Sequence, residues 1–162
     1  MEDKIQIKKS HDADTRSTDK SEVSKEQLLD NTMSHIEDVQ RVGYKLADMF
    51  KEQILNHDYT KVDYIDEFCK DFNDKLKDGS KDFKNMPWFK ERHLQERHHL
   101  NDRVPDDVNL LDVLEMVIDC SCAGLARSGD IYPIEIDSEV LKKAINNTKD
   151  LIINLTEVID EQ

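Results

Sequence analysis

Apolar residues recur every three or four positions through most of the chain, which is the period of a helix with one buried face. Stripes of this kind cover residues 25–55, 62–76, 87–100, 110–126 and 138–158. Residues 1–24 carry no stripe and only three large aliphatic residues, so they predict a disordered arm that includes His11.

Residues that cap helices or form turns separate the stripes. Ser24 suits a helix start, and residues 56–60 suit a break. Gly79 and Gly129 follow stripes, where a helix often ends on a glycine. The predicted fold class is therefore all-α: one domain of about five helices over residues 25–162, behind the arm.

Composition supports this prediction and narrows the function. The chain has 162 residues, enough for one domain with a real core, and only four glycines and three prolines. Its net charge of -13 argues against non-specific binding of nucleic acids and against binding to anionic membranes. Three cysteines without a Cys-x-x-Cys pair, a polar start and no long apolar run predict a cytoplasmic protein with reduced thiols.

The stripe over residues 110–126 is apolar nearly all round, which predicts a central buried helix. Asp119 lies within it, and a buried carboxylate is costly unless it is paired or binds a metal. Glu115 shares a helix face with Asp119, whereas Asp112 lies near the helix start and is expected to be solvated.

Histidines accompany these acids. His35 faces the apolar stripe of the first helix, and His57 and Asp58 are adjacent residues at the break that follows. Taken alone, His35 is better explained as a core histidine that is bonded to a carbonyl. Imidazole nitrogen and carboxylate oxygen both suit divalent transition metals.

The third helix carries His93, His98 and His99. Neighbouring residues on a helix are about 100° apart, so a straight helix cannot aim all three at one point. At most two are expected to be ligands unless the helix bends or ends near His98. Charged neighbours leave a solvated polar run as an equal alternative.

The order of a His, a His-Asp pair and a later Asp resembles the ligand order of the HD-domain metal-dependent phosphohydrolases, over about residues 30–130. His57-Asp58-Tyr59-Thr60-Lys61 resembles their His-Asp-x-Gly-Lys form, and His98-His99, with Pro105 downstream, resembles the His-His pair that binds extra metals. The glycine-rich stretch of cyclic-dinucleotide phosphodiesterases is absent. The layout is also similar to an uncharacterised phage-associated family of short HD-like proteins, through Trp88 and the Glu115/Asp119 pair.

The resemblance implies one or two divalent ions of Mn, Fe, Zn or Ni. One ion would be bound by His35, His57, Asp58 and Asp119. A second would be bound by His98 or His99, with His93 as a further candidate and Asp58 as the bridge. Lys61 would contact phosphate, and Glu115 would orient a histidine or accept a proton. The expected activity is hydrolysis of a phosphate ester, most plausibly a nucleotide, in the host cytoplasm if a phage encodes the chain.

Three other readings stay open. One is a non-catalytic phage-type helical protein that binds a host protein, with any metal structural. Another is an all-α nucleotide pyrophosphohydrolase, which Asp63-x-x-Asp66 and Asp112-x-x-Glu115 loosely resemble. The third is a di-iron oxygenase on the HD scaffold. The last helix is expected to pack in the core or to form half of a homodimer contact.

Overall fold

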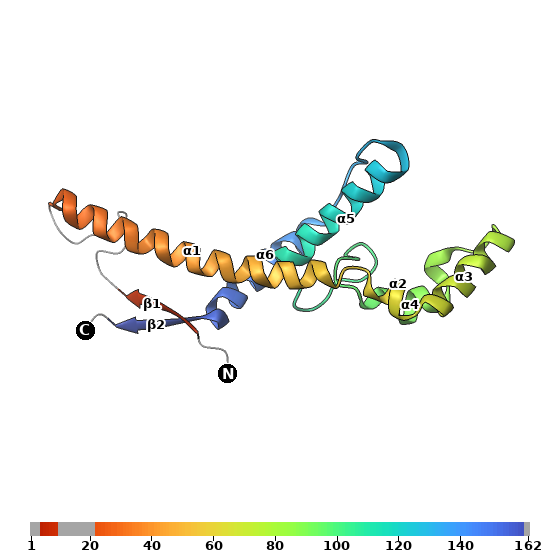
Figure 1. Ribbon diagram of the computed structural model, residues 1–162, viewed down its shortest axis with the longest axis horizontal. Coiled ribbons are helices and arrows are strands. Elements are labelled where there is room, and N and C mark those ends of the chain that lie inside the picture. The colour runs from red at the N-terminus through yellow and green to blue at the C-terminus, as the bar shows by residue number, and fades with distance from the viewer. Residues whose placement is uncertain (1–3, 10–21, 161–162) are drawn as a thin grey trace. The chain divides into compact units, whose positions relative to one another are not determined.

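A computed structural model describes residues 4–9 and 22–160 and confirms a mostly helical fold (Figure 1). The helices are α1 (Lys25–Leu55), α2 (Tyr59–Asp63), α3 (Ile65–Lys77), α4 (Pro87–Glu91), α5 (Leu110–Ser128) and α6 (Ser138–Leu155). The described residues also form two short 3-10 helices, Phe83–Asn85 and His93–Gln95, and two strands, β1 (Ile5–Lys9) and β2 (Thr156–Asp160).

The chain divides into two compact units. Unit 1 comprises Met1–Lys51 and Lys149–Gln162, and unit 2 comprises Glu52–Thr148. The domain predicted over residues 25–162 is thus distributed over both units. In the described ranges, no helix is long and apolar enough to cross a membrane.

The long helix α1 begins and ends where the sequence predicts. Gln27 N donates to Ser24 Oγ at 3.2 Å, and Ser24 N donates to Gln27 Oε1 at 3.3 Å. This reciprocal pair forms a capping box, which satisfies two backbone donors at the helix start. No residue of α1 is buried.

Strand β1 corrects the prediction of a disordered arm for residues 5–9. It pairs in parallel with β2, from Ile5 opposite Thr156 to Lys9 opposite Asp160. The predicted last helix, drawn through residue 158, instead ends at Leu155, because β-branched residues continue the chain as β2. Residues 10–21 of the predicted arm lie outside the described residues.

The second predicted helix is two helices, because Tyr64 interrupts it with φ −116° and ψ 38°. The predicted helix end at Asp78-Gly79 is confirmed, since α3 ends at Lys77 and Asp78 is the C-cap, but Gly79 does not adopt the left-handed conformation of a capping glycine. Among the residues described, the only positive-φ glycine is Gly129, which caps α5 in the left-handed region with φ 78° as expected.

The helix predicted over residues 87–100 is wrong beyond Glu91. Pro87 occupies the first turn of α4, and the Asp71 carboxylate accepts from Trp88 N at 2.8 Å. After the 3-10 turn at His93–Gln95, the chain runs without a regular helix to Asn109. Here Glu96 binds Thr60 N and Arg97 binds Asp112, so tertiary contacts override the helical pattern.

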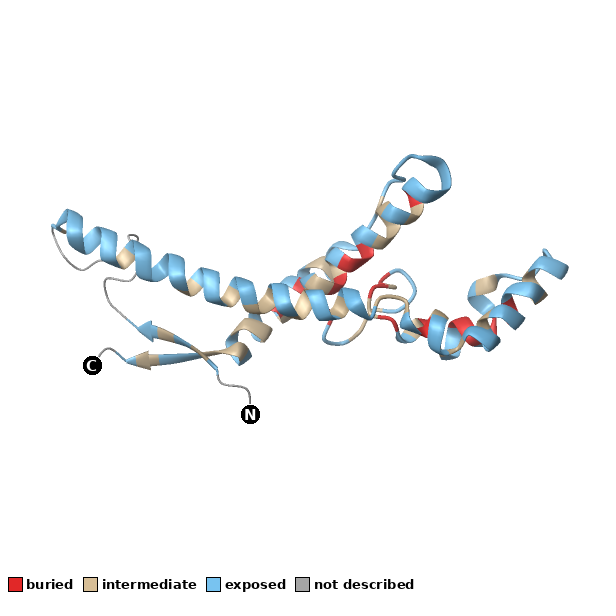
Figure 2. Ribbon diagram, in the orientation of Figure 1, coloured by how far each residue is buried: buried red, intermediate tan, exposed pale blue. Residues whose placement is uncertain are grey.

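Two apolar clusters support unit 2. One cluster gathers Leu100, Val108, Met116 and Ala144. The other brings together the aromatic rings of Phe68, Phe72, Phe83, Trp88 and Phe89, in which Phe68 stacks on Trp88. The predicted all-round burial of α5 is wrong, since only one stripe of it is buried (Figure 2). Leu114 and Leu125 are 45% and 50% exposed.

Candidate metal centre

Asp58 lies where the chain breaks between α1 and α2. It is the only non-glycine residue with positive φ, at 57°, in the described part of the chain. Asp and Asn tolerate this left-handed conformation better than most residues, and such outliers often mark functional sites. The Asp58 side chain makes no capping bond to α2, so its carboxylate is directed elsewhere.

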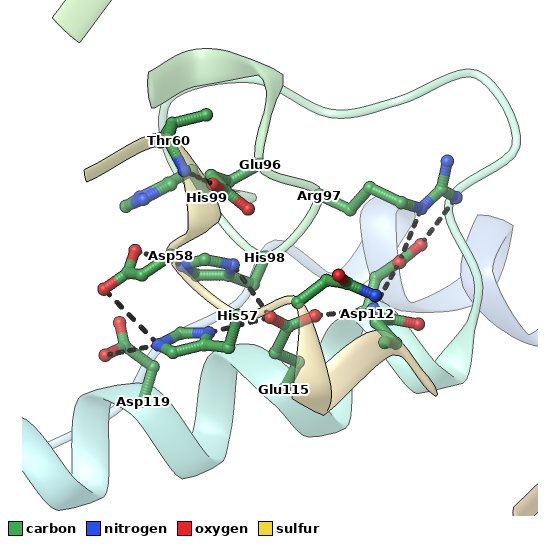
Figure 3. A network of polar contacts seen from close by, with 12 residues as sticks. His57, Asp58, Thr60, Glu96, Arg97, His98, His99, Asp112, Glu115 and Asp119 are labelled. Carbon is green, nitrogen blue, oxygen red and sulfur yellow. Dashed lines mark hydrogen bonds and ion pairs between the residues drawn. The ribbon is translucent and has the colours of Figure 1, made fainter. Parts of the chain in front are cut away.

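Asp58 belongs to a first group of ligand atoms with His57 and Asp119. His57 Nε2 lies 3.5 Å from Asp58 Oδ2 and 3.6 Å from Asp119 Oδ1. Figure 3 shows these three side chains pointing toward one another, with Asp119 projecting from α5.

Asp58 also belongs to a second group, with His98 and His99. His98 Nε2 lies 3.8 Å from Asp58 Oδ1. Both of these atoms are buried, and neither has a hydrogen-bond partner among the residues described. Buried polar atoms are rarely left without partners, so each such case requires an explanation.

These separations suit ligands of one ion better than hydrogen bonds. Hydrogen bonds in proteins span about 2.7–3.2 Å. Two atoms bound at about 2.1 Å to one ion lie roughly 3.0–3.6 Å apart for angles of about 90–120°. The 3.5, 3.6 and 3.8 Å separations therefore lie at or just beyond this range.

Glu115, on α5, forms a third group with His57 and His98 and so contacts one histidine of each of the other two groups. Its Oε1 lies 2.8 Å from His57 Nδ1 and 3.1 Å from His98 Nδ1, and its Oε2 accepts from Gln53 Nε2 at 2.6 Å. Burial alone would raise the pKa of Glu115, but the contacts with His98, His57 and Gln53 outweigh it and lower the pKa to about 2. A carboxylate at Nδ1 leaves Nε2 of each histidine available to a metal and fixes the ring orientation.

His99, a member of the second group, also contacts His93. Their Nε2 atoms lie 2.8 Å apart, and His93 Nδ1 lies 3.0 Å from Thr60 Oγ1. The His93 ring also stacks on Trp88. Burial, together with the neighbouring histidine, lowers the pKa of His93 to about 3, and burial with nearby His98 lowers that of His99 to about 4. Both rings are therefore neutral at pH 7, as metal ligands must be.

The structure thus brings together five of the predicted ligands: His57, Asp58, His98, His99 and Asp119. His93 adjoins them, with its Nε2 3.8 Å from Asp58 Oδ1, but both its ring nitrogens have other contacts. Asp119 is one-third exposed rather than buried, because it lies at the edge of the packed stripe of α5.

His35 is not part of this cluster. It lies on α1 in unit 1 with an exposed side chain, and no group of ligand atoms formed by described residues includes it. Its predicted role as a ligand stays a prediction.

Lys61 lies one turn after Asp58, and its Nζ contacts Asp58 Oδ2. Burial would raise the pKa of Asp58, but the Lys61 ammonium outweighs it and lowers that pKa. The predicted phosphate-binding lysine is therefore held at the carboxylate that the two groups share.

The sequence pattern does not predict a polar network that lies behind Glu115. Gln53 donates from one nitrogen to both Glu115 and Asp112. Arg97 also binds Asp112 (Figure 3). The expectation of a solvated Asp112 is wrong, since its side chain is fully buried by this pairing. The one available signal was Gln53, a polar residue that continues the apolar stripe of α1.

Other acids of the chain do not form a comparable centre. Asp63 and Asp66 are both exposed and belong to no ligand group that the described residues form. Asp112 is bound by Arg97. The carboxylate clusters of a pyrophosphohydrolase therefore find little support in the described geometry.

Imidazole nitrogens and carboxylate oxygens in this ratio suit Mn, Fe, Zn or Ni, and suit Mg poorly. The donor set thus fits a divalent transition metal, with His57, Asp58 and Asp119 as one set of ligands and Asp58, His98 and His99 as another. Comparison with protein-family models, curated proteins and solved structures finds no match for the chain.

Proposed function

We propose that the chain is a metal-dependent phosphohydrolase that uses one or two divalent transition metals. The observation that carries this proposal is the position of Asp58 between two ligand groups. Its Oδ1 and the facing His98 Nε2 are buried without hydrogen-bond partners in the described part of the chain, as expected of two ligands of one cation. A carboxylate shared by two ligand groups is typical of dinuclear hydrolytic sites.

When bound, the metal supplies Lewis-acid chemistry that polarises a phosphate oxygen and acidifies water. The protein supplies the surrounding charges. Lys61 would neutralise a non-bridging phosphate oxygen once a substrate competes with Asp58 for its ammonium group. Glu115 would hold His57 and His98 in the orientation that presents their Nε2 atoms.

The proposed substrate is a small phosphate ester, such as a nucleotide. The chain carries a net charge of -13, so an anionic substrate needs a local positive field. Bound cations and Lys61 would supply that field at this one place.

Turnover of phosphate esters tests this proposal. The full chain would be supplied separately with Mn²⁺, Fe²⁺, Zn²⁺ and Ni²⁺, and assayed on p-nitrophenyl phosphate, bis(p-nitrophenyl) phosphate and nucleoside phosphates. Asp58→Asn should lower the rate by roughly 100-fold or more, since it removes the charge that both ligand groups share. Asp63→Asn is the matched control, because Asp63 is exposed on α2 and belongs to no ligand group. Equal rates in all three proteins, or no turnover with any metal, would contradict the proposal.

A second candidate is a non-catalytic protein that binds a protein partner and uses any metal structurally. One observation favours it: five large apolar residues of α1, Leu28, Leu29, Met33, Ile36 and Val39, are 39–57% exposed. Stoichiometric metal that survives dialysis, together with no turnover on any ester, would favour this candidate over the hydrolase.

A further inference from the structure

A cavity of about 350 Å³ opens beside the two ligand groups in unit 2. Lys61, His99 and Asp119 line it, and so do residues beyond the metal centre. Helix α5 contributes one face of it through Asp119, Cys120, Ala123, Gly124 and Arg127. The remaining lining comes from Asn101 and the segment 132–135.

The segment after α5 lies directly on the helix at Gly124. A Cβ atom at this position would lie 2.7 Å from Asp130 O and 3.4 Å from Tyr132 Cδ2. Only glycine therefore permits this close approach. The approach places Tyr132 and the residues after it as a wall of the cavity.

Arg127 differs from the other arginines that the structure describes. Arg41, Arg92 and Arg97 each pair with a carboxylate, and Arg103 donates to Leu94 O. The Arg127 side chain makes no hydrogen bond or ion pair with any residue that the structure describes, although the chain carries 36 acidic residues. A guanidinium that lines a cavity without a partner is suited to an anion, above all a phosphate.

From this arrangement we infer that the substrate carries a second phosphate, which Arg127 binds. The inference rests on the proposed function, because it places the reacting phosphate at Lys61 and Asp119. Asp119 and Arg127 lie on one helix, about 12 Å apart along its axis at 1.5 Å per residue. This backbone separation leaves room for a spacer, so we place the two phosphates at opposite ends of a small molecule.

Binding of two matched probes tests the inference without turnover. Hexane-1,6-bisphosphonate carries two anionic ends, and hexylphosphonate carries one; neither can be hydrolysed as an ester. Calorimetry on the full chain with Mn²⁺ should show roughly tenfold or tighter binding of the bisphosphonate. Arg127→Gln should abolish this preference. Lys90→Gln should retain it, because it removes an equal charge from an exposed residue of α4 that does not line the cavity.

Three results would overturn the inference: equal binding of both probes by the wild type, binding of neither, or an unchanged preference in Arg127→Gln. A lower melting temperature with unchanged preference would show that Arg127 serves only the C-terminal end of α5.

The proposed function can fail separately. An Arg127-dependent preference in a chain that hydrolyses no ester would refute the hydrolase and leave the anion site. Metal-dependent hydrolysis of an ester without this preference would support the hydrolase and refute the anion site at Arg127.

Discussion

Loss of the Arg97 charge should destabilise unit 2, because Arg97 neutralises a fully buried carboxylate. Arg97 Nε and Nη2 donate to the two oxygens of Asp112 at 2.8 and 2.9 Å. The Asp112 side chain is 0% exposed and the Arg97 side chain 37% exposed. Asn109 N and Gln53 Nε2 also donate to Asp112, at 2.9 and 3.0 Å.

Arg97→Met keeps most of the side-chain length and leaves Asp112 buried with two hydrogen bonds. Removal of one partner from a buried ion pair costs about 3–5 kcal/mol. The remaining hydrogen bonds and the partial exposure of Arg97 favour the lower end, a loss of about 3 kcal/mol in the free energy of unfolding.

Urea unfolding can measure this loss through the single tryptophan. Trp88 is buried in unit 2, so its fluorescence follows that unit. Lys84→Met is the control: the Lys84–Asp102 pair is close, at 2.6 Å, but its side chains are 58% and 22% exposed. Such a pair contributes about 0.2–1 kcal/mol. If Arg97→Met costs no more than Lys84→Met, Asp112 is not held as a buried anion and the polar network behind Glu115 is misassigned.

Three further variants probe the site and the fold. Glu115→Gln should weaken metal binding by about 10- to 100-fold in calorimetry while the fold is retained, since the neutral amide no longer supports the ligand histidines; unchanged affinity would remove Glu115 from the site. His35→Ala should leave metal content as in the wild type, because the exposed His35 side chain joins no described ligand group; lost metal would restore it as a ligand. Gly129→Ala should cost about 1 kcal/mol in urea unfolding because φ is 78° there, whereas Gly79→Ala, without positive φ or close atoms, should cost less; equal costs would argue against the left-handed cap.

The sequence predicts the elements that local interactions determine. The start of α1 follows from Ser24 and Gln27, which are three residues apart, and the end of α5 follows from Gly129. The pairing of β1 with β2 joins opposite ends of the chain, so no local pattern could reveal it. The loss of helix after Glu91 has the same cause, because Glu96 and Arg97 bind residues far along the chain.

In the candidate site, too, the sequence reveals the residues marked by a local pattern and not those that depend on tertiary contacts. His57 and Asp58 stand out because they are adjacent at a visible break between helical stripes. The burial of Asp112 could not be inferred, because its partner Arg97 lies in a segment that reads as a helix but is irregular. The same irregularity permits His98 and His99 to approach Asp58 while His93 lies beside them. A straight helix could not direct all three histidines toward one point.

Metal content is the most direct test of the central claim, that Asp58 joins two ligand groups. Asp58→Asn is the appropriate variant, because Asn tolerates the left-handed backbone at φ 57° while it removes the charge. Elemental analysis after growth with Mn, Fe, Zn and Ni should find about one or two transition-metal ions per wild-type chain and per Asp63→Asn chain, and little in Asp58→Asn. A wild-type chain without metal, or an Asp58→Asn chain with wild-type content, would contradict the account.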